Sequence, residues 1–215
     1  MEFFSYVTTA LASYLLGSIP TGYLVAKAKG IDIRRFGSGN IGATNVFRIL
    51  GKKAGIFVLL VDAAKGFCAC WVGVWIANSH FPPDSLGGRR EIFAIISGIA
   101  AILGHNYTCF LKFKGGKGIA TTAGVLIALA PVAFLIVLAI FLLVVFTTRY
   151  VSLGAVAAAF CLPFAVWISR GSPMMIGIMT ALGALAVYKH KANIRRLLNG
   201  TENRFGQKKN AEAAK

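Results

Sequence analysis

The chain has 215 residues, 57% of them hydrophobic, and its 23 lysines and arginines against 7 aspartates and glutamates give a formal net charge of +16. Soluble domains are usually about 45–50% apolar, whereas several apolar runs here approach the roughly 20 residues that cross a bilayer. We therefore expect one polytopic membrane domain. A strong positive charge is often a sign of nucleic-acid binding, but in a membrane protein basic residues usually mark cytoplasmic loops, so we expect no nucleic-acid partner. The few carboxylates argue against a proton-relay pump.

The apolar runs predict an all-α integral membrane protein, with spans at about 3–26, 54–77, 91–111, 119–146, 151–168 and 172–188. In the first run, Pro20 is expected to kink or loosen the helix. This run lacks the basic start of a signal peptide and is followed by Lys27 and Lys29. The N-terminus is therefore expected outside.

The run 119–146 decides the topology. As one span it gives six crossings and exports the basic stretch "KHKANIRRLLNG", against the positive-inside rule. Broken at Ala130-Pro131 into two shallow or tilted helices, or a re-entrant pair, it gives about seven crossings and a cytoplasmic C-terminus. We expect a single transmembrane domain over 1–207 and a disordered basic tail over 208–215.

The first polar motif is "RRFGSGNIGATNVFR", from Arg34 to Arg48. Its glycines free the backbone around small donors, with an arginine nearby, which is typical of an anion cradle. A helix is expected from Ala43. The alternative is a solvated loop held inside by its arginines. The candidate phosphate-binding residues here are Ser38, Asn40, Asn45 and Arg48.

Asp62 and Lys65 lie one turn apart within the second apolar run. A buried carboxylate is costly unless it is paired. The pair is interpreted as mainly structural, and as able to orient a polar loop.

The second motif, "GHNYTCFLKFKGGKGIATT", has the physical logic of a phosphate-binding loop: glycine amides, a lysine and a helix that begins after them. It is not a Walker A loop, because Leu111 and Gly118 occupy its required positions, which disfavours nucleotide hydrolysis. A simple hinge is the alternative, and the His-Asn pair upstream is equally open to a packed, hydrogen-bonded role. The candidates are His105, Asn106, Gly115, Gly116, Lys117 and Gly118.

The third motif is "YKHKANIRRLLNGTENRFG". His190 and Asn193 are three residues apart, so a helix would place them on one face. The alternative is an amphipathic helix on anionic lipid. Glu202 is expected to order the basic tail and not to catalyse. The chain has no nucleophile elbow, metal-binding motif or His-x4-Asp motif, so we expect no metal, no cofactor and charge stabilisation of phosphate.

Together, "GSIPTGYL", "GSGNIGATNVFR", "VDAAKG", "GHNYTCFLKFKGGKGIAT" and "HKANIRRLLNGTENRFG" resemble the bacterial acyl-phosphate:glycerol-3-phosphate acyltransferases, the PlsY family. The resemblance extends from about residue 10 to 208. The family commonly has His-Arg where this chain has His190-Lys191, a change that keeps the charge.

The resemblance implies transfer of a fatty acyl group from acyl phosphate to the sn-1 hydroxyl of glycerol 3-phosphate. The products would be 1-acylglycerol 3-phosphate (lysophosphatidic acid) and phosphate, in the first step of bacterial phospholipid biosynthesis. It also implies a location in the cytoplasmic (inner) membrane with the active site on the cytoplasmic face, contact with membrane lipids and, as an option, coupling to the enzyme that makes acyl phosphate. The implied catalytic residues are Ser38, Arg48, Lys117, His190 and Asn193.

Acyl phosphate is already activated and phosphate is a good leaving group, so an acyl-enzyme is not needed. The proton acceptor is either a substrate phosphate oxygen, which we favour, or His190. Two other hypotheses are an organophosphate transporter and a non-catalytic lipid-binding scaffold. The polar motifs are predicted on one side of the membrane only, which favours the enzyme over a transporter.

Overall fold

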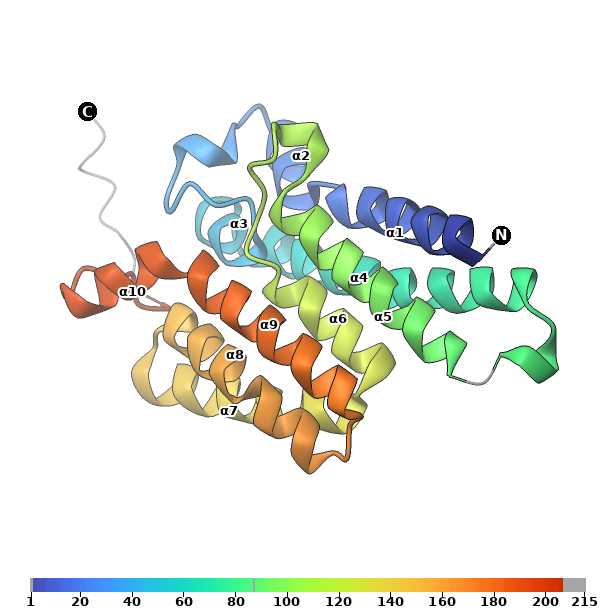
Figure 1. Ribbon diagram of the computed structural model, residues 1–215. Helices are drawn as coiled ribbons and strands as arrows, with labels where there is room; N and C mark the ends of the chain where they lie inside the picture. Colours follow the sequence, from blue (N-terminus) through green and yellow to red (C-terminus); the bar gives the residue numbers. More distant parts are fainter. Residues whose placement is uncertain (1, 87, 207–215) are drawn as a thin grey trace. The chain divides into compact units, whose positions relative to one another are not determined.

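The computed structural model of the chain describes residues 2–86 and 88–206, and its regular elements within these ranges are all helices, as predicted (Figure 1). Packing divides the chain into two compact units, Met1–Phe134 and Leu135–Lys215, which are described separately. The single domain expected over 1–207 stays a prediction, and the tail expected over 208–215 lies outside the described residues.

The first unit is built on the four longer helices α1, α4, α5 and α6 and the polar segments that connect them. The kink or loosening predicted at Pro20 is found as a full break, because α1 ends at Ser18 and α2 begins at Thr21. The elements are α1 (Glu2–Ser18), α2 (Thr21–Lys27), η1 (Ile33–Arg35), α3 (Ala43–Leu50), α4 (Lys52–His80), η2 (Pro83–Ser85), α5 (Arg89–Asn106), η3 (Cys109–Leu111) and α6 (Ile119–Leu129).

The second unit begins within α7 (Pro131–Thr148) and continues through α8 (Val151–Ile168), α9 (Pro173–Lys189) and α10 (Lys191–Leu198). The predicted break at Ala130-Pro131 is confirmed, since α6 ends at Leu129 and α7 begins at Pro131. Helices α8 and α9 pack closely: a Cβ at Gly183 would lie 2.6 Å from the Ala159 carbonyl oxygen.

Four segments of the described chain are long and apolar enough to cross a membrane: Lys52–His80, Arg89–Leu111, Pro131–Thr148 and Val151–Ile168. The candidate crossings also include two shorter apolar helices, α6 and α9, and the 17-residue α1. With these helices, the number of candidate crossings agrees with the predicted number of about seven. The pair α6 and α7 is unequal. The 11 residues of α6 rise only about 17 Å, whereas α7 comes close to the roughly 30 Å of a hydrocarbon core.

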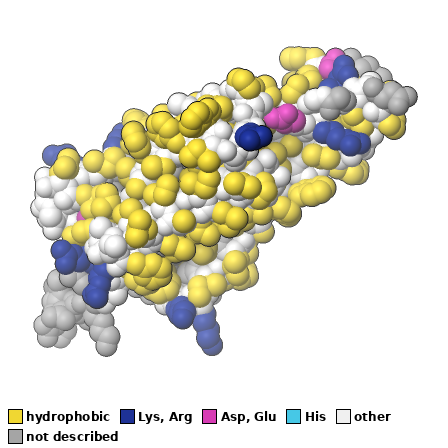
Figure 2. Space-filling view, turned by 90° about the horizontal axis from the view of Figure 1, so that it is seen from below, with side chains coloured by type: hydrophobic (Ala, Val, Ile, Leu, Met, Phe, Trp, Pro, Cys, Tyr) yellow, Lys and Arg dark blue, Asp and Glu magenta, His cyan; other side chains and the backbone are white. Residues whose placement is uncertain are grey.

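The surface has the apolar character of a membrane protein. Figure 2 shows hydrophobic side chains over most of the visible face. Trp75 of α4 is 69% exposed and Phe146 of α7 is 78% exposed, and only 11% of the α7 span is buried. Such surface would favour aggregation in water but is expected where side chains face lipid.

Glycines bring the helices of the first unit into close contact. Added Cβ atoms at Gly17 of α1 and Gly104 of α5 would collide with the backbone of the opposite helix, at Ala101 and Tyr14 respectively. In the same way, Gly124 of α6 rests on the backbone of α4. Small residues allow such close approach in membrane bundles. They place the end of α5, with the polar motif that follows it, against α1 and α4.

Candidate active site

The first motif forms a loop held together by a buried asparagine. Asn45, in the first turns of α3, is 2% exposed. Its Oδ1 accepts from the Ser38 backbone N–H at 2.9 Å, and its Nδ2 donates to the carbonyls of Asn40 at 2.9 Å and Phe36 at 3.0 Å. The amide predicted to bind phosphate is thus engaged by the loop's own backbone. Its role is to shape the loop.

Glycines permit this loop conformation. Gly37 has φ +60°, and a Cβ there would collide with Oδ1 of Asn45. Asn40 makes a local turn in which its Oδ1 accepts from the Gly42 N–H at 2.8 Å. Of the four candidates in this motif, Ser38 is exposed and Arg48 is half-buried on α3. The helix predicted from Ala43 is confirmed.

An ion pair fixes the start of the same loop. Arg34 binds Asp32 through two side-chain bonds, Nη2 to Oδ2 at 2.8 Å and Nε to Oδ1 at 2.9 Å. These bonds, with a smaller contribution from the Arg34 backbone N–H, lower the pKa of Asp32 to about 2. Arg34 therefore already has an anionic partner within the loop.

The second motif is a loop closed on the end of α5. The Gly116 N–H donates to the His105 carbonyl at 2.9 Å, and the Gly115 N–H donates to the Asn106 carbonyl at 3.2 Å. The expectation that these two glycine amides cradle phosphate is therefore corrected, because both satisfy carbonyls that α5 leaves at its C-terminus. The predicted helix start is confirmed: Gly118, at φ +80°, leads directly into α6.

His105 and Asn106 lie beneath this loop. They are 5% and 1% exposed. A Cβ added to Gly116 would collide with the His105 ring, and one added to Gly118 would lie 2.8 Å from Asn106 Oδ1. Both side chains were candidates for binding phosphate. Their burial favours the alternative, a packed support for the loop.

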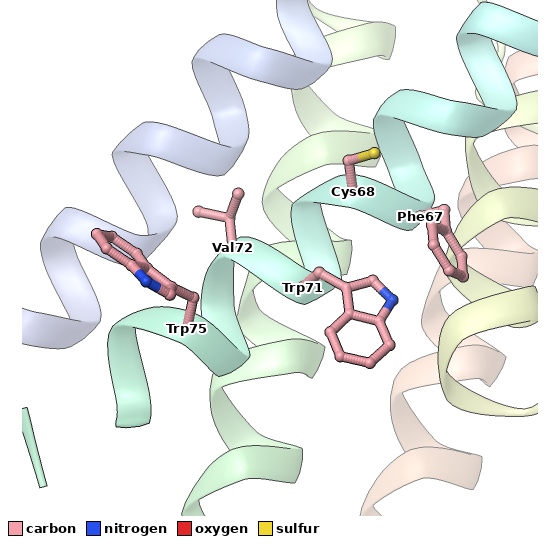
Figure 3. Close-up of a pocket in the computed structure, with 5 residues that line it drawn as sticks. All are labelled: Phe67, Cys68, Trp71, Val72 and Trp75. Atoms are coloured by element: carbon pink, nitrogen blue, oxygen red, sulfur yellow. The ribbon is translucent and has the colours of Figure 1, made fainter. Parts of the chain in front are cut away.

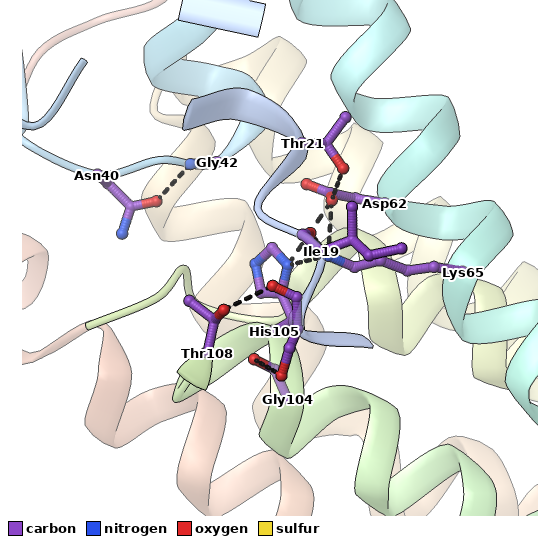
Figure 4. A network of polar contacts seen from close by, with 10 residues as sticks. Ile19, Thr21, Asn40, Gly42, Asp62, Lys65, Gly104, His105 and Thr108 are labelled. Atoms are coloured by element: carbon purple, nitrogen blue, oxygen red, sulfur yellow. Dashed lines mark hydrogen bonds and ion pairs between the residues drawn. The ribbon is translucent and has the colours of Figure 1, made fainter. Parts of the chain in front are cut away.

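His105 is part of a buried charged network (Figure 4). The Lys65 ammonium lies 2.9 Å from Asp62 Oδ1, 2.9 Å from His105 Nδ1 and 3.0 Å from the Ile19 carbonyl oxygen. Asp62 also accepts from the Thr21 hydroxyl at 3.0 Å. The predicted Asp62–Lys65 pair is confirmed. Its other partners were missed, because only the fold brings the α1–α2 break and the end of α5 to α4.

The two glycine loops of the first unit are anchored on the same buried hydrophobic cluster. Leu111, just before the second loop, belongs to the same buried cluster as three residues that flank or lie within the first loop, Ile33, Ile41 and Val46. Both motifs therefore lie at one end of the first unit, with Arg48 and Lys117 half-buried in them. The sequence predicted that the two motifs lie on the same side of the membrane, but it did not predict that they pack on one cluster.

The third motif organises the end of the second unit. His190 is 3% exposed and lies between α9 and α10. Its Nδ1 lies 2.8 Å from the Ala186 carbonyl, which can only accept, so Nδ1 carries a proton. A single helix through His190 and Asn193 is not found: the chain turns at His190, whose carbonyl accepts from the Asn193 N–H at 2.8 Å.

Glu202 holds this motif together. Its Oε1 accepts from Asn193 Nδ2 at 3.0 Å, and its Oε2 accepts from Arg196 Nε at 2.7 Å. The following residues return to the turn between α7 and α8, where Arg204 donates to the Tyr150 hydroxyl at 3.0 Å. The expectation that Glu202 orders the basic tail is confirmed for the residues described.

One apolar groove lies outside these motifs. Phe67, Cys68, Trp71, Val72 and Trp75 line it along the outward face of α4 (Figure 3). It offers no charged group for an anion, so we do not place the active site there. Within residues 2–86 and 88–206, three or more His, Cys, Asp or Glu side chains do not gather at a point where they could hold a metal ion.

The comparisons with known proteins agree on one family. A family model described as glycerol-3-phosphate acyltransferase matches residues 7–200. The glycerol-3-phosphate acyltransferase of Geotalea daltonii is 48% identical over 201 residues, covering 94% of this chain and 98% of that protein. That of Clostridioides difficile is 44% identical over 211 residues, covering 97% and 100%.

Two solved structures are also similar. A crystal structure of PlsY, an integral membrane glycerol 3-phosphate acyltransferase, in its glycerol 3-phosphate form aligns with a TM-score of 0.83 at 40% identity, covering 94% of this chain and 96% of that chain. The lysophosphatidic acid form aligns with a TM-score of 0.80 at 39% identity, with the same coverage of 94% and 96%.

Proposed function

The chain belongs to the glycerol-3-phosphate acyltransferase family, in its PlsY group, and on that premise we propose that it acylates the sn-1 hydroxyl of glycerol 3-phosphate with acyl phosphate as donor. The products are 1-acylglycerol 3-phosphate and inorganic phosphate. We place the enzyme in the bacterial inner membrane, with its active site on the cytoplasmic face and with functional coupling to the enzyme that supplies acyl phosphate.

One observation carries the proposal: two glycine loops with basic residues lie at one end of the first unit, on a shared buried cluster. Both substrates carry phosphate, and a cation that binds phosphate through charge-assisted hydrogen bonds suits them. In the proposal, Arg48 and Lys117 bind the phosphate groups and Ser38 donates to one of them. Asn40, Asn45, His105 and Asn106 support the loops, with Gly115, Gly116 and Gly118 allowing the close packing.

The reaction forms an ester bond from the sn-1 oxygen to the acyl carbonyl carbon, and breaks the bond from that carbon to the phosphate oxygen. The hydroxyl has to lie about 3–3.5 Å from the carbonyl carbon. The developing oxyanion needs hydrogen-bond donors. The departing phosphate takes the hydroxyl proton, so neither an acyl-enzyme nor a protein base is required.

For the second unit, we propose that His190 and Asn193 position phosphate. The Nδ1–H of His190 is directed to the Ala186 carbonyl, and Asn193 is held by Glu202. Both side chains are therefore fixed in orientation, as a binding role requires.

The test is an assay of the purified protein with palmitoyl phosphate and labelled glycerol 3-phosphate. We expect labelled lysophosphatidic acid and stoichiometric phosphate. Palmitoyl-CoA in place of palmitoyl phosphate should not support turnover, because the chain lacks the His-x4-Asp motif. Equal rates with the two donors would overturn the choice of donor. Uptake of glycerol 3-phosphate into liposomes without acylation would favour a transporter, and neither activity would favour a lipid-binding scaffold.

A further inference from the structure

We propose that Lys65 is a positioning residue that holds the Gly115–Gly118 loop in its substrate-binding conformation through His105. Lys65 lies inside α4 and its side chain is 4% exposed, so it acts through its neighbours and not by touching substrate from solvent. The inference rests on the proposed function, and it takes the phosphate bound by Lys117 to be that of glycerol 3-phosphate.

The ammonium of Lys65 has three N–H donors, and the structure gives it three acceptors. They are Asp62 Oδ1 on its own helix, the Ile19 carbonyl at the break between α1 and α2, and His105 Nδ1 near the end of α5. Each comes from a different segment. One buried cation therefore ties three parts of the first unit to a common point.

The third of these bonds fixes the state of His105. Because an ammonium only donates, Nδ1 of His105 is the acceptor and the ring proton of the neutral imidazole is on Nε2. The Nε2 edge is the part of the ring that packs against Gly116: an added Cβ at Gly116 would collide with it. The bond to Lys65 thus sets both the tautomer and the orientation of the ring beneath the loop.

Besides the ring, the backbone of His105 also contacts the loop. Its carbonyl accepts the Gly116 N–H at 2.9 Å, so ring and backbone hold the same glycine. Lys117, the cation proposed to bind phosphate, is the next residue. A rotated His105 ring would displace Gly116 and with it Lys117.

The folded state does not need the Asp62–Lys65 ion pair for its stability. Replacing a buried ion pair by apolar groups of similar volume is often neutral or stabilising, whereas removing one partner is strongly destabilising. The difference allows a structural role of Lys65 to be separated from a positioning role. The chain offers the pair of variants that is needed.

The experiment compares Lys65→Met with the double variant Asp62→Leu/Lys65→Met. The single variant should lower the melting temperature, because it leaves the Asp62 carboxylate buried without its cation. The double variant should recover thermal stability. Its KM for glycerol 3-phosphate should stay raised by roughly tenfold, the effect of losing one hydrogen bond to a charged group, with a smaller change in kcat.

The matched control is Lys53→Met, which removes a lysine from the exposed start of the same helix and should change neither quantity. A double variant that regains both stability and the wild-type KM would overturn the proposal, since the pair would then be structural only. Wild-type protein without acyltransferase activity would instead refute the proposed function.

A second test avoids dependence on the folding of the Lys65 variants. His105→Gln keeps an acceptor for the ammonium but removes the ring from beneath Gly116. His105→Gln should raise the KM for glycerol 3-phosphate. Gly116→Ala should raise the KM less in the His105→Gln background than in the wild type, because both substitutions act on the same contact. An unchanged KM in His105→Gln, or fully additive effects, would contradict the proposed link.

Discussion

Gly116 and Gly118 lie so close to the end of α5 that any side chain at these positions would collide with His105 or Asn106. The sequence predicted their importance but gave the wrong reason for Gly115 and Gly116, whose amides bind carbonyls of α5. Sequence spacing reveals a glycine-rich turn, whereas the identity of the hydrogen-bond acceptor depends on tertiary packing. The same limit applies to Asn45, which was predicted to bind phosphate and is found to bind its own loop.

For Gly116→Ala we expect a raised KM for glycerol 3-phosphate in a protein that still inserts into the membrane. The added methyl collides with the His105 ring, and such overpacking typically costs about 1–3 kcal/mol. Gly118→Ala should act similarly because its φ of +80° is unfavourable for alanine. Steady-state kinetics provide the measurement.

The matched control for this prediction is Gly30→Ala. Gly30 has φ +73° but no neighbouring atom within 4 Å of an added Cβ, so it carries the backbone strain without the contact. Its KM should equal that of the wild type. If the KM were also unchanged in both loop variants, the loop would be a hinge only.

His190→Gln separates a positioning role from that of a general base. Because its Nδ1–H is directed to the Ala186 carbonyl, His190 can position phosphate only as an imidazolium that donates through Nε2. In that case glutamine preserves a donor, and the KM should suffer more than kcat. We expect this result, because acyl phosphate brings its own leaving group and proton acceptor. Lys191→Gln, a change at the exposed neighbouring residue, is the control. A loss of kcat above about 10³-fold at constant KM would instead identify His190 as the base.

At the scale of elements, the helices were largely predictable and their polar ends were not. Hydrophobic runs and two prolines gave the breaks at Pro20 and Ala130-Pro131, because proline acts locally. The turn at His190 was missed, since "KHKANIRRLL" contains no proline or glycine to indicate it. The Lys65 network was missed beyond its Asp62 partner, because its members come from separate helices.

The short helix α10 should depend on Glu202. This carboxylate accepts from both Asn193 and Arg196 and its side chain is only 6% exposed, so Glu202→Ala removes two bonds to a charged group from a sheltered position. We expect a loss of about 1.5–3 kcal/mol of local stability and faster proteolysis after Arg195 or Arg196. Limited trypsin digestion in detergent measures it. Cleavage at the wild-type rate would show that α10 is ordered by other contacts.

At the scale of the whole molecule, we predict an extracytoplasmic N-terminus and a cytoplasmic C-terminus. Seven crossings place the two ends on opposite sides, and the positive-inside rule places the basic third motif inside. In a cysteine-free background, Ser85→Cys should react with an impermeant thiol reagent from outside and Thr201→Cys only after permeabilisation. Labelling of both positions from the same side would contradict this topology.

The brevity of α6 has a consequence for the surrounding lipid. At about 17 Å, this 11-residue helix is much shorter than a hydrocarbon core, while α7, which follows it directly, comes close to matching one. Adjacent helices of unequal length create hydrophobic mismatch, which a bilayer relieves by thinning or a helix by tilting. The protein is therefore expected to work against a locally deformed bilayer, and its turnover should vary with the acyl-chain length of the host lipid, even when both substrates are saturating.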